Sequence, residues 1–314
     1  MKIAMLFPGY GSQFVGMGKS LYDESRIMQE HFEQASTCLD MNFVKLCFAS
    51  SELDIAKMSV AFPAIYLMSS SIYSILREDE GIVPDVVVGY NIGEFSAIYA
   101  SGGISFVDGL YVVSKYASFY GELLSGLNVS LIKVSGLSSG ILKEICEQYS
   151  TNDAFASIAI YLNEQENIVS GYCAVVEQVE AAVKERAGKV ENLGVEFGLH
   201  NSIMKPVADS VKQYLEKVDF KDTDIKFLSS TELDVTKSGQ SLKAAILEYI
   251  TSPLKWRQTL DALDFYDMII EVGPGTTLSK SIKELYPEKH FISINSQKDI
   301  DEVLKIVAGE EREI

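Results

Sequence analysis

The sequence predicts an α/β protein whose mostly parallel sheet is covered by helices and interrupted by a smaller inserted unit. Short apolar segments alternate with helical patterns over residues 1–126 and again over 196–314, and this alternation is typical of parallel sheets flanked by helices. The intervening residues 127–195 show the pattern strand, helix, strand, strand, helix, strand, which is the order of the split βαβ or ferredoxin-like unit. We therefore expect a large domain formed by 1–126 and 196–314 and a small domain formed by 127–195.

The first part of the large domain is predicted to begin with a buried strand at 2–7, followed by a glycine turn at 8–13. From the residues alone this turn is interpreted as structural, because a lone Gly-x-Gly is a weak signal for an anion site. An apolar run at 86–88 supplies the second strand. Apolar residues at helical spacing predict helices at 20–39, 60–76, 94–100 and from the cap-like segment 104–108 to about 124.

The small domain and the last part of the large domain are predicted by the same patterns. The expected strands are 129–134, 154–161, 167–170, 189–193, 225–229, 268–272 and 291–295, and the expected helices are 139–149, 175–187, 204–218, 242–249 and 277–285. The helix at 242–249 is expected to stop before Pro253, because a residue that precedes proline disfavours the helical conformation.

The segment around Asn91 carries the strongest local signal. The apolar strand ends in Gly-Tyr-Asn-Ile-Gly at 89–93 and passes directly into a helical pattern. A strand, a sharp turn and a helix in this order form the outline of a nucleophile elbow, whose glycines avoid collisions with neighbouring chain. The apex residue is Asn91, and an amide has no ionisable proton with which to form the acyl intermediate of a Ser or Cys. The sequence therefore predicts the frame of a covalent catalyst without its nucleophile.

Composition indicates where the protein works and which partners it avoids. We find neither the long apolar region of a signal peptide nor an uncharged apolar run long enough to span a membrane, so we expect a cytoplasmic protein. The net charge of −17 disfavours nucleic acid and anionic membranes as partners. The 4 cysteines are widely spaced and signal neither a metal site nor a disulfide framework, and we expect no metal or cofactor.

Four segments occur in an order that resembles a known family. They are Phe-Pro-Gly-Tyr-Gly-Ser-Gln at 7–13, Gly-Tyr-Asn-Ile-Gly-Glu at 89–94, Leu-His-Asn-Ser-Ile-Met-Lys-Pro at 199–206 and Glu-Val-Gly-Pro-Gly at 271–275. Together they resemble the malonyl-CoA:acyl-carrier-protein transacylases and the acyltransferases of polyketide synthases over nearly the whole chain. The resemblance implies an α/β-hydrolase-like large domain with a ferredoxin-like small domain inserted, and an active site in the cleft between the two.

The resemblance also implies a reaction and its partners. In that family a Ser at the elbow takes an acyl group from CoA and passes it to the phosphopantetheine thiol of an acyl carrier protein, with a His as base. His200 lies where that base is expected. The implied partners are therefore an acyl carrier protein with its phosphopantetheine arm, and acyl-CoA.

Several site positions depart from the family pattern. Tyr90 and Asn91 stand where the family has His-Ser, and Tyr10 stands where it has a Gln near the oxyanion hole. The Arg that pairs with the malonyl carboxylate corresponds to Tyr116, and a buried carboxylate without such a partner is strongly disfavoured. The predicted catalytic positions are His200, Asn91 and Tyr90, and the predicted substrate-binding positions are Tyr10, Ile92, Phe62, Tyr116 and Tyr249.

Two functions from different classes follow from these departures. The first is a non-catalytic protein of fatty acid or polyketide biosynthesis that holds a carrier protein or its arm, since the nucleophile and the carboxylate partner are both absent. The second is an enzyme that dehydrates, isomerises or hydrolyses a carrier-bound thioester, with His200 as base, a tyrosine hydroxyl as proton donor and Asn91 as a donor to the thioester carbonyl. A third hypothesis, acyl transfer with Ser96 or Ser202 as the nucleophile, has less support because neither serine occupies the apex of the elbow. Lys115 and Lys205 are predicted to meet an acidic carrier.

Overall fold

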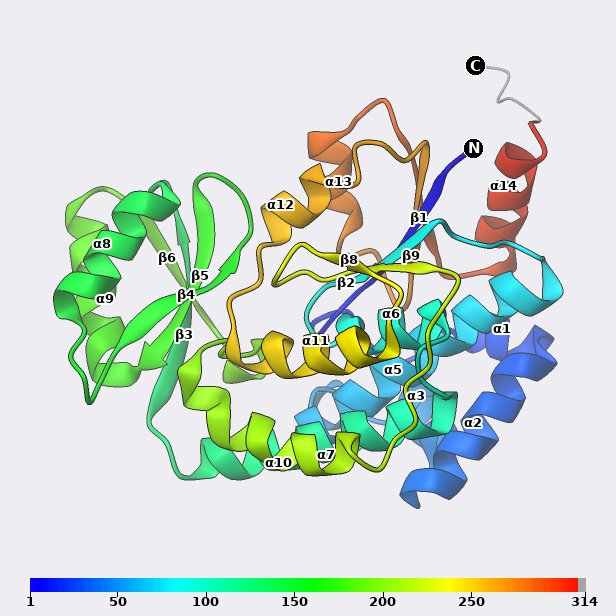
Figure 1. Ribbon diagram of the computed structural model, residues 1–314, viewed down its shortest axis with the longest axis horizontal. Coiled ribbons are helices and arrows are strands. Elements are labelled where there is room, and N and C mark those ends of the chain that lie inside the picture. The colour runs from blue at the N-terminus through cyan, green and yellow to red at the C-terminus, as the bar shows by residue number, and fades with distance from the viewer. Residues whose placement is uncertain (310–314) are drawn as a thin grey trace.

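The computed structural model describes residues 1–309 and contains two sheets, which Figure 1 shows side by side. The larger sheet has the strand order β10-β9-β1-β2-β7-β8. Its strands are β1 (Ile3–Phe7), β2 (Val86–Gly89), β7 (Lys226–Leu228), β8 (Val235–Thr236), β9 (Met268–Val272) and β10 (His290–Ile294). Neighbouring strands are parallel except β7 and β8, so the mostly parallel sheet predicted from the sequence is present.

The carboxyl ends of the three central strands lie next to one another. In the parallel register, β1 places Phe7 opposite Gly89 of β2 and Leu6 opposite Glu271 of β9. The glycine-containing turns that follow these strands therefore meet at one edge of the sheet, where open α/β sheets form their ligand sites. All residues of β1, β2 and β9 are buried, as expected of strands that are covered on both faces.

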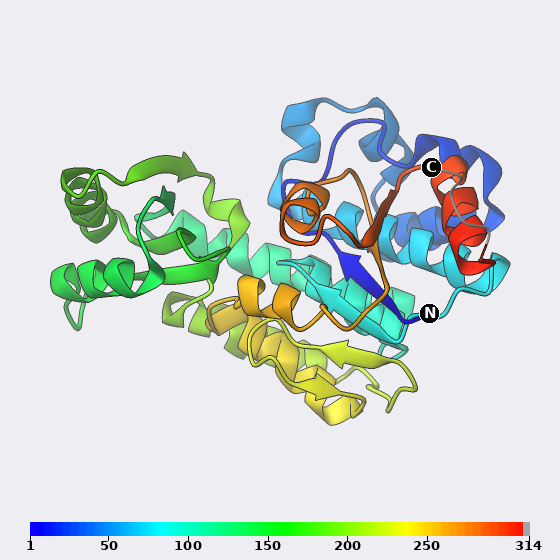
Figure 2. The ribbon, with the colours of Figure 1, turned by 90° about the horizontal axis from the view of Figure 1, so that it is seen from above.

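Helices pack on either side of the larger sheet (Figure 2). They are α1 (Lys19–Glu24), α2 (Arg26–Leu39), α3 (Phe43–Ala49), α4 (Glu52–Ile55), α5 (Met58–Ser74), α6 (Gly93–Ser101), α7 (Phe106–Ser125), α10 (Lys205–Leu215), α11 (Gly239–Thr251), α12 (Trp256–Asp261), α13 (Ser279–Leu285) and α14 (Gln297–Val307). Single turns also occur at η1 (Ile75–Asp79), η2 (Val195–Phe197) and η3 (Ser202–Met204).

Some of these elements differ from the sequence prediction. The helix expected at 20–39 is two helices, because Ser25 is extended (φ −102°, ψ 121°) and caps α2 by accepting a hydrogen bond from the Met28 amide. The short elements β8, α3, α4 and α12 were not predicted. Neither was α14, although Ser296 and Asp299 form a capping box at its start that marks a helix in the sequence.

The smaller sheet is antiparallel and has the order β4-β5-β3-β6. Its elements are β3 (Val129–Ser135), α8 (Ser139–Tyr149), β4 (Ala156–Tyr161), β5 (Glu166–Tyr172), α9 (Cys173–Glu185) and β6 (Lys189–Leu193), in the order that the sequence predicted. Apolar residues of the sheet and of both helices form a separate buried cluster, which includes Ile132, Val169 and Val179. The exact domain boundaries, 127 and 195, stay a prediction.

The smaller sheet is joined to the rest of the chain by hydrogen bonds. The edge strand β4 accepts a hydrogen bond at the Ala159 carbonyl from the Leu254 amide (2.9 Å) and donates one from the Tyr161 amide to the Leu254 carbonyl (2.9 Å). On β5, the Ser170 hydroxyl donates to the Leu199 carbonyl and accepts from the Asn201 amide (2.8 Å). The chain segments on both sides of His200 are thereby fixed to this sheet.

The helix predicted at 60–76 is present as α5, and together with the turn η1 it forms a long apolar segment. The expectation that no apolar run is long enough to span a membrane is wrong for this segment. By length and composition alone, Met58–Asp79 could cross a membrane. In the structure 94% of its most apolar window is buried against other parts of the protein. Packing in the core therefore accounts for the apolar character of this helix.

Candidate active site

The predicted elbow is formed by the end of β2, a tight turn and the start of α6. Asn91 at its apex has a φ of 54°, in the left-handed region that few side chains other than Asn tolerate. A Cβ atom on Gly89 would lie 2.1 Å from the Glu94 nitrogen, and one on Gly93 would lie 2.1 Å from the Phe7 carbonyl oxygen. Both glycines are needed because backbone passes where a side chain would be. The elbow predicted from 89–93 is therefore present.

His200 faces the apex from the loop that follows the smaller sheet. Its Nδ1 lies 3.0 Å from the Tyr249 carbonyl oxygen, which can only accept, so Nδ1 carries the proton. Its Nε2 is then an acceptor and lies 3.0 Å from the Asn91 amide nitrogen. Burial lowers the pKa of His200 to about 4, so the ring is neutral at physiological pH. The structure thus joins the predicted residues Asn91 and His200 directly.

The amide of Asn91 has a partner for each of its hydrogen-bonding positions. Its nitrogen donates to His200 Nε2 and to the Phe197 carbonyl oxygen (2.6 Å). Its oxygen accepts from the backbone amides of Ile92 (2.7 Å) and Tyr10 (3.4 Å). Asn91 is 2% exposed and His200 is 1% exposed. The pair is thus a closed, internally satisfied network.

Aromatic rings fill the space around this network. Phe62 lies between Tyr10 and Tyr116, with ring centroids 6.0 and 5.6 Å away. The Tyr249 ring contacts Tyr116 at 6.0 Å and His200 at 5.1 Å. Tyr116 and Tyr249 are each 1% exposed. The four aromatic positions of the predicted substrate-binding set are therefore brought together, but as packed rings and not as an open cavity.

Tyr90 does not face the His200 ring as the predicted catalytic grouping would require. Its ring packs against Trp256, with centroids 4.8 Å apart. Within residues 1–309, no hydrogen bond joins the Tyr90 hydroxyl to Asn91 or His200. A catalytic role for Tyr90 has no geometric support.

Sequence reasoning missed several residues that shape the site. Phe197 contributes the carbonyl that binds Asn91, and its ring contacts Tyr10 at 5.2 Å. Phe95 stacks on Tyr116 at 5.8 Å, and the Tyr120 hydroxyl donates to the Val195 carbonyl. The one sequence feature that could have pointed to Phe197 as a site residue is its closeness along the chain to His200. The other contacts depend on how helices α6 and α7 pack, which local patterns do not encode.

The first turn of α6 also holds a buried acid, Glu94. Its Oε2 accepts a hydrogen bond from the Ser230 hydroxyl (3.1 Å), and its Oε1 has no partner in the described part of the chain. The side chain is fully buried, and this burial raises the pKa of Glu94 from 4.5 to about 8. The carboxyl group is therefore protonated in the folded protein at neutral pH.

Replacing Glu94 by glutamine should flatten the pH dependence of stability. Between pH 4.5 and about 8 the folded state keeps a proton on Glu94 that the unfolded state releases, so the free energy of unfolding falls as pH rises through this window. The glutamine of Glu94→Gln cannot ionise. The decrease of a few kcal/mol in the free energy of unfolding between these pH values should therefore be absent in this variant. Calorimetric unfolding of both proteins across this window tests the prediction. An unchanged pH slope in Glu94→Gln would contradict the buried, protonated state.

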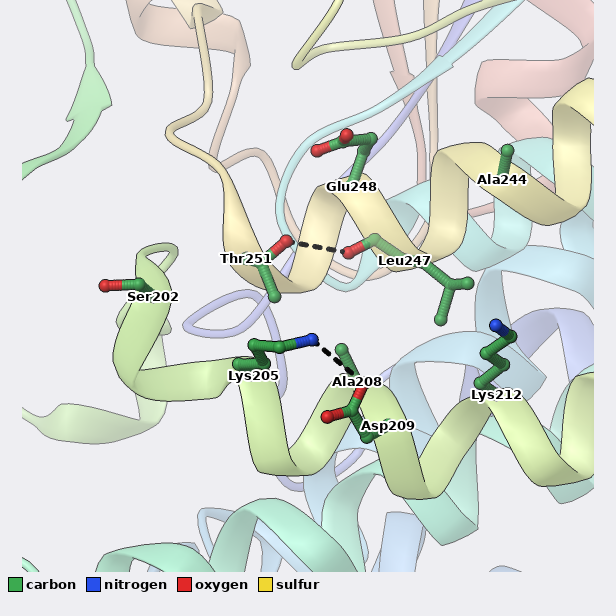
Figure 3. A pocket seen from close by; sticks show the side chains of 9 residues that line it. All are labelled: Ser202, Lys205, Ala208, Asp209, Lys212, Ala244, Leu247, Glu248 and Thr251. Atoms are coloured by element: carbon green, nitrogen blue, oxygen red, sulfur yellow. Dashed lines mark hydrogen bonds and ion pairs between the residues drawn. The ribbon is translucent and has the colours of Figure 1, made fainter.

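A groove of about 550 Å³ lies between α10 and α11, and neither Asn91 nor His200 lines it. Figure 3 shows its side chains: Ser202, Lys205, Ala208, Asp209, Lys212, Ala244, Leu247, Glu248 and Thr251. Lys205 pairs with Asp209 at 3.2 Å, and Lys115 stands over the rings of Tyr111 and Tyr214. Both lysines predicted to meet a carrier therefore have partners within the protein.

Comparison with known proteins identifies the family of this chain. The family described as "Acyl transferase domain" matches residues 4–303. The chain belongs to this family. It is 28% identical to the malonyl CoA-acyl carrier protein transacylase of Bacillus subtilis over 98% of both chains. It is 30% identical to that of Synechocystis, over 96% of this chain and 99% of the relative.

The fold of this acyl transferase domain also matches solved structures. A malonyl-transacylase in complex with a type II polyketide-synthase acyl-carrier protein superposes with a TM-score of 0.92, covering 98% of this chain and 100% of that one. At 22% identity, this match concerns the fold alone. It supports a mixed α/β architecture with a large and a small domain, as the sequence predicted.

Two backbone amides at the elbow of this acyl transferase domain are placed like the donors of an oxyanion hole. In elbows of this kind, the amide that follows the apex and an amide from a neighbouring loop bind the developing oxyanion. Here these are the amides of Ile92 and Tyr10, and both donate to the Asn91 side-chain oxygen. The Asn91 side-chain oxygen is therefore the acceptor for both of these amides.

Proposed function

We propose that this acyl transferase domain binds the phosphopantetheine arm of an acyl carrier protein in fatty acid or polyketide biosynthesis, and does not transfer malonyl through an elbow nucleophile. The proposal rests on the identity of Asn91 and on its hydrogen bonds. Asn91 stands where the family's Ser is expected, offers no nucleophile, and has its whole amide bound within the protein. The relatives are named as malonyl CoA-acyl carrier protein transacylases, and on that basis we propose an acyl carrier protein and acyl-CoA as the partners of this chain.

The surroundings of Tyr116 support the absence of malonyl transfer. The position that we align with the family's carboxylate-binding Arg holds a tyrosine stacked on Phe62, Phe95 and Tyr120. A malonyl carboxylate in this environment would be desolvated without a cationic partner. Removing one partner of a buried ion pair costs about 3–5 kcal/mol. Neutral acyl groups avoid this cost.

We also propose the finer architecture that the resemblance implies. The elbow between β2 and α6 supports an α/β-hydrolase-like large domain at 1–126 and 196–314. The strand order of the smaller sheet supports a ferredoxin-like small domain at 127–195. A cytoplasmic location, without nucleic acid or membrane partners, is proposed from the composition and the net charge of −17.

Acid–base chemistry by His200 and a tyrosine has less support. His200 Nε2, the atom that would take a proton, is bound by Asn91 at 3.0 Å. Among residues 1–309, His200 forms its hydrogen bonds with Asn91 and the Tyr249 carbonyl and with no tyrosine hydroxyl. We therefore place this chain with the binding proteins and not with enzymes of altered chemistry.

Arm binding predicts that a holo-carrier binds more tightly than the same carrier without its arm. Titration calorimetry with the holo and apo forms of a bacterial fatty acid synthase carrier protein measures the difference, and we expect roughly tenfold or more. Phe265→Ala is the control variant. Phe265 is 77% exposed and precedes β9, at the opposite end of the sheet from the elbow, so this change should leave both affinities unaltered. Equal affinity for holo and apo carrier would contradict arm binding.

A further inference from the structure

Residues 194–198 form a strap that runs over the elbow on the way from β6 to His200. The Phe197 carbonyl accepts the hydrogen bond from Asn91, and the Phe197 ring contacts Tyr10 nearly edge-on (5.2 Å, 86°). A Cβ atom on Gly11 would lie 3.2 Å from this ring, so the ring also covers the first glycine turn. With the strap in place Asn91 is 2% exposed, and no ligand reaches the apex unless the strap moves.

Few interactions hold the strap closed. Besides the ring contact of Phe197 with Tyr10, two side-chain hydrogen bonds within residues 1–309 join the strap to the large domain. They run from the Asn91 side-chain nitrogen to the Phe197 carbonyl and from the Tyr120 hydroxyl to the Val195 carbonyl. Within the strap, the amides of Phe197 and Gly198 donate to Gly194 and Val195 carbonyls at 3.2 Å each. A single weak turn of this kind opens at a low free-energy cost.

Glycine at both ends lets the strap change direction. Gly198 has a φ of 98°, and a Cβ atom there would lie 2.4 Å from His200 Nε2. Gly194 precedes the turn at the other end. The adjoining Leu199 is fixed to the smaller sheet through Ser170. The strap can therefore lift between its two glycines while His200 keeps its position.

We infer that the strap occupies the inner end of the arm-binding site in the free protein, and that a carbonyl of the incoming pantetheine arm replaces the Phe197 carbonyl on Asn91. The inference rests on the proposed function. A pantetheine arm carries amide carbonyls and ends in a thioester, so it offers the same acceptor group that Phe197 offers. Exchange of one carbonyl for another keeps the Asn91 nitrogen satisfied in both states. When the Phe197 ring moves away from Tyr10, the arm can reach Asn91.

Hydrogen exchange at the Phe197 and Gly198 amides tests this inference. Tyr120→Phe removes one of the two side-chain hydrogen bonds that join the strap to the large domain, and exchange at these amides should become roughly tenfold faster. Tyr99→Phe is the matched control, because it removes a tyrosine hydroxyl that is hydrogen-bonded to Ser74 (2.8 Å) outside the strap, and it should leave this exchange unchanged. Equal effects of the two substitutions would overturn the role of Tyr120 in closing the strap.

The unaltered chain provides the second measurement. A saturating holo-carrier should speed exchange at the Phe197 and Gly198 amides, whereas the apo-carrier should not. Failure of the holo-carrier to bind at all overturns the proposed function. Binding of the holo-carrier with unchanged exchange at these two amides overturns the strap alone, so the two failures are distinguishable.

Discussion

Gly93→Ala should prevent the chain from reaching its native fold. The added Cβ would lie 2.1 Å from the Phe7 carbonyl oxygen and 2.7 Å from the Pro8 carbonyl oxygen. Both are backbone atoms of the strand and turn next to the elbow, so neither can rotate away. Relief of these overlaps requires β1 and β2 to separate from α6. The total stability of a domain is only about 5–15 kcal/mol, and we expect the substitution to remove most of it.

Gly121→Ala is the matched control for this experiment. Gly121 lies inside α7, and a Cβ atom there would meet nothing within 4 Å. Alanine is favoured over glycine in a helix by roughly 0.5–1 kcal/mol, so this variant should be slightly more stable than the native chain. Urea unfolding followed by circular dichroism measures the stability of both variants. A folded Gly93→Ala protein with native stability would show that the elbow is not packed as described.

Asn91→Ser should turn the unreactive apex into a slow acyl acceptor. Removing the amide frees His200 Nε2 to accept the serine proton and frees the Ile92 and Tyr10 amides to bind an oxyanion. The native chain, with no hydroxyl at the apex, should give no adduct with acyl-CoA. Intact-mass spectrometry after incubation with acetyl-CoA or malonyl-CoA should show an adduct only in Asn91→Ser.

The choice of acyl group tests the aromatic site in the same experiment. The site around Tyr116 offers rings and no cation, so the variant should label at least about 30-fold faster with acetyl than with malonyl, corresponding to about 2 kcal/mol. Asn91→Ala, which removes the amide without adding a hydroxyl, is the control and should stay unlabelled. Labelling of Asn91→Ala would place the acceptor elsewhere, and equal rates with both acyl groups would show that a partner for the carboxylate exists.

The burial of Tyr116 determines the expected effect of placing an arginine at this position. The sequence alone suggests that adding Tyr116→Arg to Asn91→Ser would shift preference back towards malonyl. In the structure Tyr116 is 1% exposed and enclosed by aromatic rings. A guanidinium there would be buried without a partner, which costs several kcal/mol. We expect the double variant to be destabilised instead.

The strands, the helices and the elbow could be predicted from the sequence, because each depends on patterns within a few neighbouring residues. The apolar run at 86–88 with its glycines gave the elbow, and the two short segments around Asn91 and His200 gave the central pair. What the sequence did not predict depends on distant contacts. The direction of Tyr90 depends on Trp256, and the closed site depends on Phe197 lying over Tyr10. Such contacts appear only once helices and sheets are packed.

The hydrogen bonds between the smaller sheet and the rest of the chain have a mechanical consequence. Leu254 is bound to β4 through main-chain groups, and the segment around His200 is bound to β5 through Ser170. A hinge motion that widened the gap between the two sheets would have to break these bonds and would pull His200 away from Asn91. These hydrogen bonds therefore resist a hinge motion between the two sheets, whereas the lifting of residues 194–198 that we infer leaves them intact.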